Sequence, residues 1–155
     1  MANNYTQIYI QLVFSPFRKC ALITFDYEQK LYKYITGIVQ NKKHKLLAIN
    51  GTEDHLHIFL GLNPDQSISD LIADIKRSSS MWINENNFVK GRFEWQKGFG
   101  AFSYSRSHID SVVKYIGNQK EHHKKVSFLD EYRDILRKFN IEFDEKYLFT
   151  KPTEK

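Results

Sequence analysis

The stretch Asp54-His55-Leu56-His57-Ile58-Phe59-Leu60 carries an apolar residue at every second position. This period of two is typical of a β-strand, because successive side chains of a strand point to opposite faces of the sheet. Leu56, Ile58 and Leu60 are therefore expected on one face, and His55 and His57 on the other. Two imidazoles on one face of a rigid strand are close enough to hold one metal ion, but the same spacing also occurs on ordinary solvated sheet faces.

Strands and helices alternate on both sides of this stretch. The first strand ends at Ser15-Pro16, because proline has no N–H to donate to a strand ladder. Two later segments carry apolar residues at helical spacing, which predicts amphipathic helices. The expected elements are a strand at 7–14, a helix at 26–40, a strand at 46–50, a helix at 68–84, and an extended segment from 93 to 104 that Gly98 and Gly100 interrupt.

With the histidine strand included, the order of elements is β-α-β-β-α-β. Short connections and right-handed crossovers fold such a chain into one antiparallel sheet with two helices on one face, an α+β fold of the ferredoxin-like or RRM-like kind. The other sheet face is expected to stay open, with His55 and His57 looking out from it. We expect one domain over residues 1–155, with a core from about 5 to 140 and a tail at 141–155.

Composition places the chain among soluble globular proteins, since 41% of its residues are apolar and 26% are charged. No apolar run approaches the ~18 residues that span a bilayer, and the N-terminus lacks a signal-peptide pattern, so no membrane association is expected. Cys20 is the only cysteine, which excludes an internal disulfide. A cytoplasmic location is the expectation that follows.

The formal charge of +5 and the 15% of aromatic residues are compatible with nucleic-acid binding. Basic side chains neutralise phosphates, and aromatic rings stack on unpaired bases. The same numbers also describe a slightly basic enzyme with an aromatic core. The basic residues expected nearest a bound strand are Lys42, Lys43, Lys45, Lys76, Arg77, Arg92 and Lys97.

Two more amphipathic helices are expected after the last strand, at 108–123 and 128–139. The first carries Tyr115 and Gln119, whose spacing of four residues places them one above the other on the helix surface. Taken alone, Tyr115 could equally be a partly buried aromatic residue, and Gln119 an ordinary surface residue.

Together, His55, His57 and Gln119 could supply two imidazole nitrogens and an amide oxygen to one ion. A mixed nitrogen and oxygen set suits Mn²⁺ and tolerates Mg²⁺, whereas structural zinc prefers a closed set richer in thiolate. Such an ion would polarise a phosphodiester, and the Tyr115 phenol could attack the phosphorus. A phenol has a pKa near ~10 and needs a base or an electric field to react, and the sequence does not identify the base.

Three motifs resemble one known family. His55-Leu56-His57 is similar to the His-hydrophobic-His signature of HUH endonucleases. Tyr115-Ile116-Gly117-Asn118-Gln119, followed by His122-His123, resembles the nucleophile helix of their single-tyrosine transposases, which serve the insertion sequences numbered two hundred and six hundred and five. The run from Trp95 to Ser103 is also similar to that family, and the likeness extends from the first strand to Tyr147-Leu148.

The resemblance implies a DNA transposase that cleaves and rejoins single-stranded DNA without ATP. It implies that His55, His57 and Gln119 bind Mg²⁺ or Mn²⁺ and that Tyr115 forms a 5′-phosphotyrosine. It further implies recognition of DNA hairpins at element ends, and a homodimer joined through its sheets in which one subunit's helix can serve the other's histidines. Phe59 and Gly117 depart from the family pattern, and Gly117 weakens the helix between Tyr115 and Gln119.

Other functions remain open at this point. An RRM-like binding module has the same element order, but it needs no His-x-His motif, and no RNP1-like run is evident here. A domesticated relative that processes genomic palindromes would use the same chemistry. A replication or mobilisation nuclease usually belongs to a longer chain, and an inactive remnant would not need all four of His55, His57, Tyr115 and Gln119.

Overall fold

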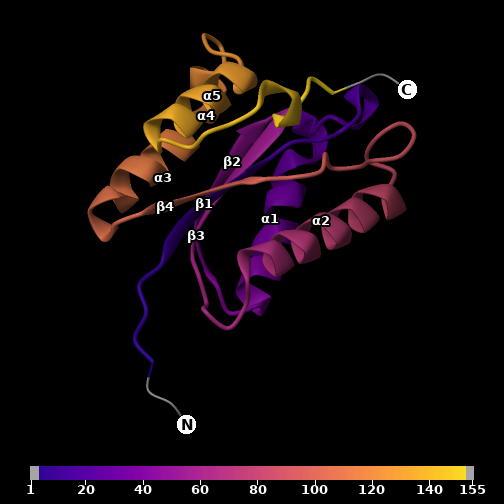
Figure 1. Cartoon of the computed structure of the whole chain (residues 1–155). Helices are drawn as coiled ribbons and strands as arrows, with labels where there is room; N and C mark the ends of the chain where they lie inside the picture. The colour runs from indigo at the N-terminus through magenta and orange to yellow at the C-terminus, as the bar shows by residue number, and fades with distance from the viewer. Residues whose placement is uncertain (1–3, 153–155) are drawn as a thin grey trace.

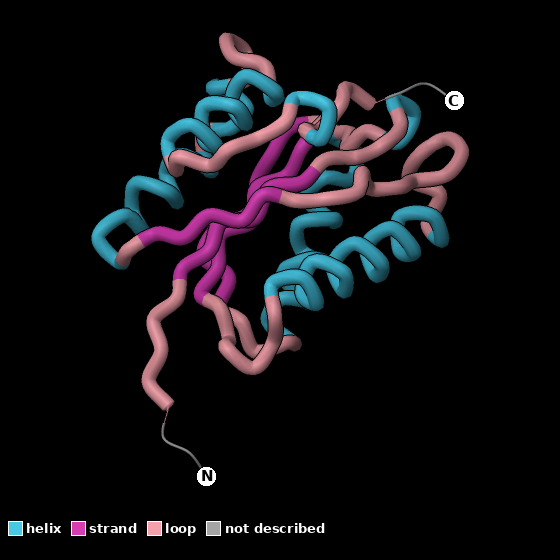
Figure 2. Tube along the Cα trace, in the orientation of Figure 1, coloured by secondary structure: helices cyan, strands magenta, loops and turns pink. Residues whose placement is uncertain are grey.

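The computed structural model describes residues 4–152 of the chain. Its centre is a four-stranded antiparallel sheet with the strand order β2-β3-β1-β4, as Figures 1 and 2 show. The elements follow the predicted order β-α-β-β-α-β, so the α+β fold class is confirmed. The strands are β1 (Tyr9–Phe14), β2 (Lys45–Thr52), β3 (His55–Gly61) and β4 (Gly100–Tyr104).

Helices α1 (Phe25–Asn41) and α2 (Ile68–Glu85) cover one face of the sheet (Figure 1). The Ser67 hydroxyl accepts a hydrogen bond from the Asp70 N–H at 3.0 Å, and this cap sets the start of α2. Leu56, Ile58 and Leu60 of β3 are fully buried in the core beneath these two helices. The period of two along this strand therefore predicted correctly which of its side chains share the face under α1 and α2.

The expectation that the second sheet face stays open is wrong. Helices α3 (Ile109–Gly117), α4 (Gln119–His122) and α5 (Phe128–Lys138) lie on that side of the sheet (Figure 1). Phe59 of β3 packs there against Val112 and Ile116 in a second, smaller apolar cluster. An apolar helix stripe must be buried against another element, and this sheet face is the surface on which α3 buries its own.

The extended segment predicted at 93–104 is interrupted at Gly98, as expected, and only its second part forms a strand. β4 begins at Gly100, and before it Trp95 makes only an isolated bridge to Pro16. Gly98 has a φ of +88°, in the left-handed region that favours glycine, so the chain turns there instead of continuing as a strand. Residues 92–97 consequently form an irregular segment beside α2.

Within residues 4–152, three short 3₁₀ turns complete the fold. They are η1 (Lys19–Ala21), η2 (Arg106–His108) and η3 (Glu145–Tyr147). After η3, Phe149 is buried against Phe128 and Tyr132, which fixes the described part of the C-terminal tail. Residues 1–3 and 153–155 of the predicted domain lie outside the described residues. Between residues 4 and 152, no helix is long and apolar enough to cross a membrane.

Candidate active site

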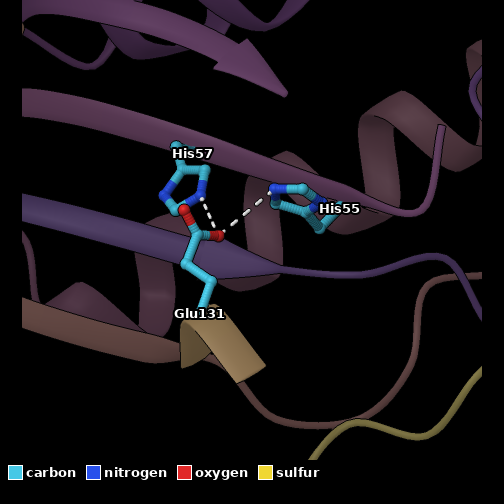
Figure 3. A group of neighbouring side chains, drawn as sticks. All are labelled: His55, His57 and Glu131. Atoms are coloured by element: carbon cyan, nitrogen blue, oxygen red, sulfur yellow. Dashed lines mark hydrogen bonds and ion pairs between the residues drawn. The ribbon is translucent and has the colours of Figure 1, made fainter. Parts of the chain in front are cut away.

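The two histidines of β3 lie beneath α3, α4 and α5. Both side chains are fully buried, and their rings meet edge to face with centroids 5.0 Å apart. The ring of His55 also stacks on Phe128 of α5, with centroids 4.2 Å apart and planes within 9°. Figure 3 shows both imidazoles pointing toward one carboxylate, that of Glu131. His55 and His57 therefore lie on the same face of the sheet, as predicted, but helices cover that face and it is not open to solvent.

The helix predicted at 108–123 is broken in the middle. α3 ends at Gly117, and α4 starts at Gln119. Asn50 of β2 stabilises the break, because its side-chain N–H₂ donates to the carbonyl of Ile116 at 3.0 Å and to that of Gly117 at 3.3 Å. These bonds satisfy backbone oxygens that the end of a helix leaves without a partner. Gly117, which weakens a helix intrinsically, is thus the residue where α3 stops.

Glu131 of α5 is the centre of the site, and the sequence analysis did not select it. Its carboxylate is 2% exposed. It accepts hydrogen bonds from the Tyr115 hydroxyl, from Gln119 Nε2 at 2.9 Å and from His57 Nε2 at 3.1 Å. His123 Nε2 is 3.0 Å away and His55 Nε2 is 3.5 Å away. Residues from β3, α3, α4 and the turn after α4 therefore converge on one side chain of α5.

A sequence signal for Glu131 does exist. The buried residues of α5 are Phe128, Glu131, Tyr132, Ile135 and Leu136, which follow the helical spacing of an apolar stripe. A carboxylate at a stripe position is rarely buried unless it is paired. Its presence there predicts a charged or metal-binding partner inside the fold.

The Nε2 atom of His55 faces the side-chain oxygen of Gln119 at 2.8 Å. Its other nitrogen, Nδ1, lies 2.8 Å from the Asp54 carboxylate, which can only accept, so Nδ1 carries a proton. Gln119 directs its N–H₂ group to Glu131, so its oxygen must be the atom that faces His55. The lone pairs of this oxygen and of an Nε2 atom without a proton are donors that one cation can bind side by side.

His57 is held by Gln11 of β1. The side-chain N–H₂ of Gln11 donates to His57 Nδ1 at 2.9 Å, and the Gln11 oxygen accepts from the Tyr104 hydroxyl at 2.9 Å. Because Nδ1 accepts, Nε2 carries the proton that is donated to Glu131. Burial lowers the pKa of His57, and the contact with Glu131 only partly offsets that effect. The ring is therefore neutral at neutral pH, as a metal ligand must be.

Tyr115 lies beside this pair, with its ring centroid 6.0 Å from that of His57. Burial raises the pKa of the Tyr115 phenol far above its usual range, and the negative charge of Glu131 raises it further. The proton therefore stays on the phenol in this arrangement. Tyr115 therefore lies beside the histidine pair as a neutral phenol.

Glu131 keeps its negative charge although it is buried. Burial alone would raise the pKa of its carboxyl, but hydrogen bonds from His123 and His57 outweigh burial and hold the pKa far below the usual range. His123 responds in the opposite sense. Burial tends to lower the pKa of His123, but its hydrogen bond to Glu131 raises the net value. His123 donates through Nδ1 to the Val126 carbonyl at 2.6 Å and through Nε2 to Glu131, so it acts as a cationic partner of the carboxylate.

These residues fit a divalent metal ion. One ligand atom each from His55, His57 and Glu131 lie within 4.8 Å of one another, and all three side chains are buried. The Gln119 oxygen, which lies 2.8 Å from His55 Nε2, adds a fourth possible donor atom. A second group, His122, His123 and Glu131, meets the same distance limit. The first group is the more enclosed, because all three of its side chains are buried, whereas His122 and His123 are only partly buried.

The structure brings together the four residues predicted for chemistry, His55, His57, Tyr115 and Gln119, and it does so within one chain. Six of the seven basic residues predicted to lie nearest DNA line two pockets. Lys76, Arg77, Arg92 and Lys97 line a pocket beside α2, whereas Lys43 and Lys45 line another near the end of β3. Lys42 lies 3.5 Å from Asp74, which also pairs with Arg77 at 2.9 Å.

Comparison with solved structures defines the class of fold. A candidate transposase from Deinococcus radiodurans superposes with a TM-score of 0.58 at 17% identity, over 77% of this chain and 96% of that chain. A REP-associated tyrosine transposase bound to a REP hairpin gives a TM-score of 0.60 at 15% identity, over 100% of this chain and 97% of that one. At these identities the likeness establishes the fold.

The family is established by the sequence itself. The family model described as "Transposase IS200 like" matches residues 4–119, which include His55, His57, Tyr115 and Gln119. The chain belongs to the IS200-like transposase family. A search among curated proteins found no match.

Proposed function

We propose that this protein is a metal-dependent single-tyrosine transposase that cuts and rejoins single-stranded DNA. The observation that carries the proposal is the convergence of His55, His57, Tyr115 and Gln119 on the buried carboxylate of Glu131. A structural binding module has no need to bury a histidine pair, a glutamate and a tyrosine hydroxyl in contact with one another. Membership of a transposase family is consistent with this chemistry.

His55, His57, Gln119 and Glu131 would hold Mg²⁺ or Mn²⁺. Imidazole, amide and carboxylate donors without thiolate suit these ions. When bound, the ion would polarise the scissile phosphodiester and neutralise charge on its oxygens. Asp54 and Gln11 orient the two imidazoles through their second nitrogens, which fixes the rings in the direction of the site.

Tyr115 would be the nucleophile. Its hydroxyl oxygen would bond to the phosphorus while the bond from phosphorus to the 3′ oxygen of the preceding nucleotide breaks. The products are a 5′-phosphotyrosine and a strand with a free 3′-hydroxyl, which can attack the phosphotyrosine phosphorus, releasing the Tyr115 phenol and rejoining the DNA. Glu131 is the group in place to accept the phenolic proton, since the Tyr115 hydroxyl already donates to it. The phenol would give up this proton only with its pKa lowered by a bound ion, because the pKa of Glu131 itself lies far below its usual range.

A hairpin DNA with a single-stranded flank is the proposed substrate. The net charge of +5 favours a nucleic acid, and the solved neighbour of the same fold is bound to a REP hairpin. That neighbour also makes a palindrome-processing relative the second candidate function. The two candidates share the same chemistry and differ only in the DNA on which it acts.

The test is a covalent adduct. The protein is incubated with a hairpin oligonucleotide carrying a single-stranded flank in the presence of Mn²⁺, and the products are separated on a denaturing gel. We expect a protein–DNA band for the wild type and for Tyr104→Phe, and none for Tyr115→Phe. An adduct in Tyr115→Phe would remove the nucleophile assignment. No adduct from the wild type with any hairpin would favour a non-catalytic RRM-like binding module instead.

A further inference from the structure

A pocket of about 760 Å³ lies between α2 and the irregular segment of residues 92–97. Pockets of ~300–1,000 Å³ accommodate small organic ligands, and a single nucleotide falls within that range. The pocket is separate from the site around Glu131, whose residues do not line it. Four of the seven basic residues predicted to lie near DNA line this pocket.

The pocket combines positive charge with aromatic surface. Lys76, Arg77, Arg92 and Lys97 line it, and Glu94 is the one acidic residue in its wall. The side chains of Arg77 and Arg92 are 66% and 76% exposed, so both guanidinium groups can reach a ligand in solution. The partly buried rings of Phe17 and Trp95 complete the wall. The four basic residues and Glu94 give the wall a net charge of about three positive units. Positive charge suits a phosphate, and the rings beside it suit a base.

Lys76 determines the shape of the pocket. Its ammonium group donates to the backbone carbonyls of Gln96 at 2.9 Å and Gly98 at 2.6 Å, and these bonds tie residues 96–98 to α2. Trp95 is fixed in turn, because its indole N–H donates to the Ser79 hydroxyl at 2.9 Å. The wall is therefore preformed, and a ligand would bind it without first ordering a loop.

A chain of contacts leads from the pocket to His55. Gln96 Nε2 is 3.5 Å from the Ser15 hydroxyl, which donates to the Asp54 carbonyl at 2.6 Å. The Asp54 carboxylate in turn contacts His55 Nδ1 at 2.8 Å. The isolated bridge between Pro16 and Trp95 belongs to the same end of the sheet. The pocket and the histidine pair thus adjoin the same short stretch that follows β1.

We propose that this pocket binds an unpaired nucleotide of the single-stranded DNA flank, with the phosphate against Arg92 and Lys97 and the base against Trp95. The proposal rests on the proposed function for its choice of ligand. Stacking on a ring is open to any unpaired base, whereas a base inside a duplex is not available for it. The pocket would therefore distinguish single-stranded from double-stranded DNA near the cleavage site.

Binding is tested without cleavage, in Mg²⁺-free buffer containing EDTA. The probe is an oligothymidylate of about eight nucleotides, and its affinity is measured by fluorescence anisotropy. Arg92→Ala/Lys97→Ala removes two exposed charges of the pocket, and Lys30→Ala/Lys33→Ala removes two exposed charges of α1 as the matched control. We expect the pocket variant to bind about tenfold more weakly, with a salt slope lower by about 0.7 for each lost contact, and the control to change less than about twofold. Equal losses in both variants would overturn the proposal.

Fluorescence of Trp95 reports on the base. The chain has two tryptophans, so Trp82→Phe leaves Trp95 as the only one. We expect the oligothymidylate to quench its emission and a blunt duplex of the same length to leave it unchanged. Quenching by both probes, or by neither, would overturn the proposal. An adduct with Mn²⁺ but no quenching refutes the pocket alone, whereas quenching without an adduct refutes the proposed transposase chemistry alone.

Discussion

The hydroxyl of Tyr115 and the carboxylate of Glu131 are joined by a hydrogen bond between two helices, α3 and α5. The same oxygen of Glu131 accepts from Gln119 Nε2 at 2.9 Å. The buried carboxylate of Glu131 therefore binds both Tyr115 and Gln119, the two residues that a spacing of four predicted on the same side of a helix. Tyr115, Gln119 and the two histidines share Glu131 as their common partner.

Glu131→Gln is expected to weaken Mn²⁺ binding by about 10- to 100-fold, because it replaces a negative oxygen donor with a neutral amide of nearly the same shape. Isothermal titration calorimetry measures the affinity without DNA. The control is Glu121→Gln, since the Glu121 side chain is 66% exposed and forms a surface ion pair with Lys124 at 2.9 Å. An unchanged Mn²⁺ affinity in Glu131→Gln would place the ion elsewhere.

His55→Ala and His57→Ala are expected to abolish adduct formation, whereas Gln119→Ala should only slow it. An imidazole that faces the ion cannot be replaced by a small side chain, but water can replace one amide oxygen. Hairpin binding in EDTA, measured by gel shift, should stay within about twofold of the wild type for all three variants, because these residues are buried away from solvent. An adduct formed at the wild-type rate by either histidine variant would contradict the metal assignment.

A mixture of His57→Ala and Tyr115→Phe subunits is expected to remain inactive. In the structure Tyr115 lies against His57 of its own chain, and every ligand of the site comes from that chain. A mixed dimer therefore contains a defect in each site. Recovery of the adduct on mixing would show that Tyr115 serves the partner's histidines, as the family resemblance allows.

A homodimer remains a prediction. Within residues 4–152, β2 and β4 are the two edges of the sheet and have a strand on one side only. An unpaired edge favours pairing with another strand, and two copies of one edge can pair across a two-fold axis. Light scattering coupled to size-exclusion chromatography, with and without hairpin DNA, measures the mass. A monomer under both conditions would contradict this prediction.

Stability should rise with pH above neutrality because of Lys76. Burial lowers the pKa of Lys76 to about 8, below the ~10.4 of an unfolded lysine. Between these values the unfolded chain binds more protons than the folded one, so the free energy of unfolding increases with pH in that window and is flat with respect to Lys76 below it. Urea unfolding from about pH 7.5 to 9.5 should show a steeper rise for the wild type than for Lys76→Met. Equal slopes would mean that Lys76 is not buried as the structure has it.

The fold class, the buried face of β3 and the shared face of the histidines followed from sequence periodicity alone. Each depends on contacts between near neighbours, because a strand repeats every two residues and a helix every 3.6. The helical spacing of four also predicted that Tyr115 and Gln119 lie close together. Glu131 binds both of them, although α3 ends at Gly117 between the two residues.

The covered second face, the break at Gly117 and the central place of Glu131 were decided by tertiary structure. Glu131 and His57 are 74 residues apart, and their contact exists only because the chain after β4 folds back over the sheet. No spacing of residues along the chain predicts that this segment folds back. It folds back because α3 and α5 must bury their apolar stripes against the sheet. Glu131 is the acidic residue of the buried α5 stripe, and this packing places it beside the histidines.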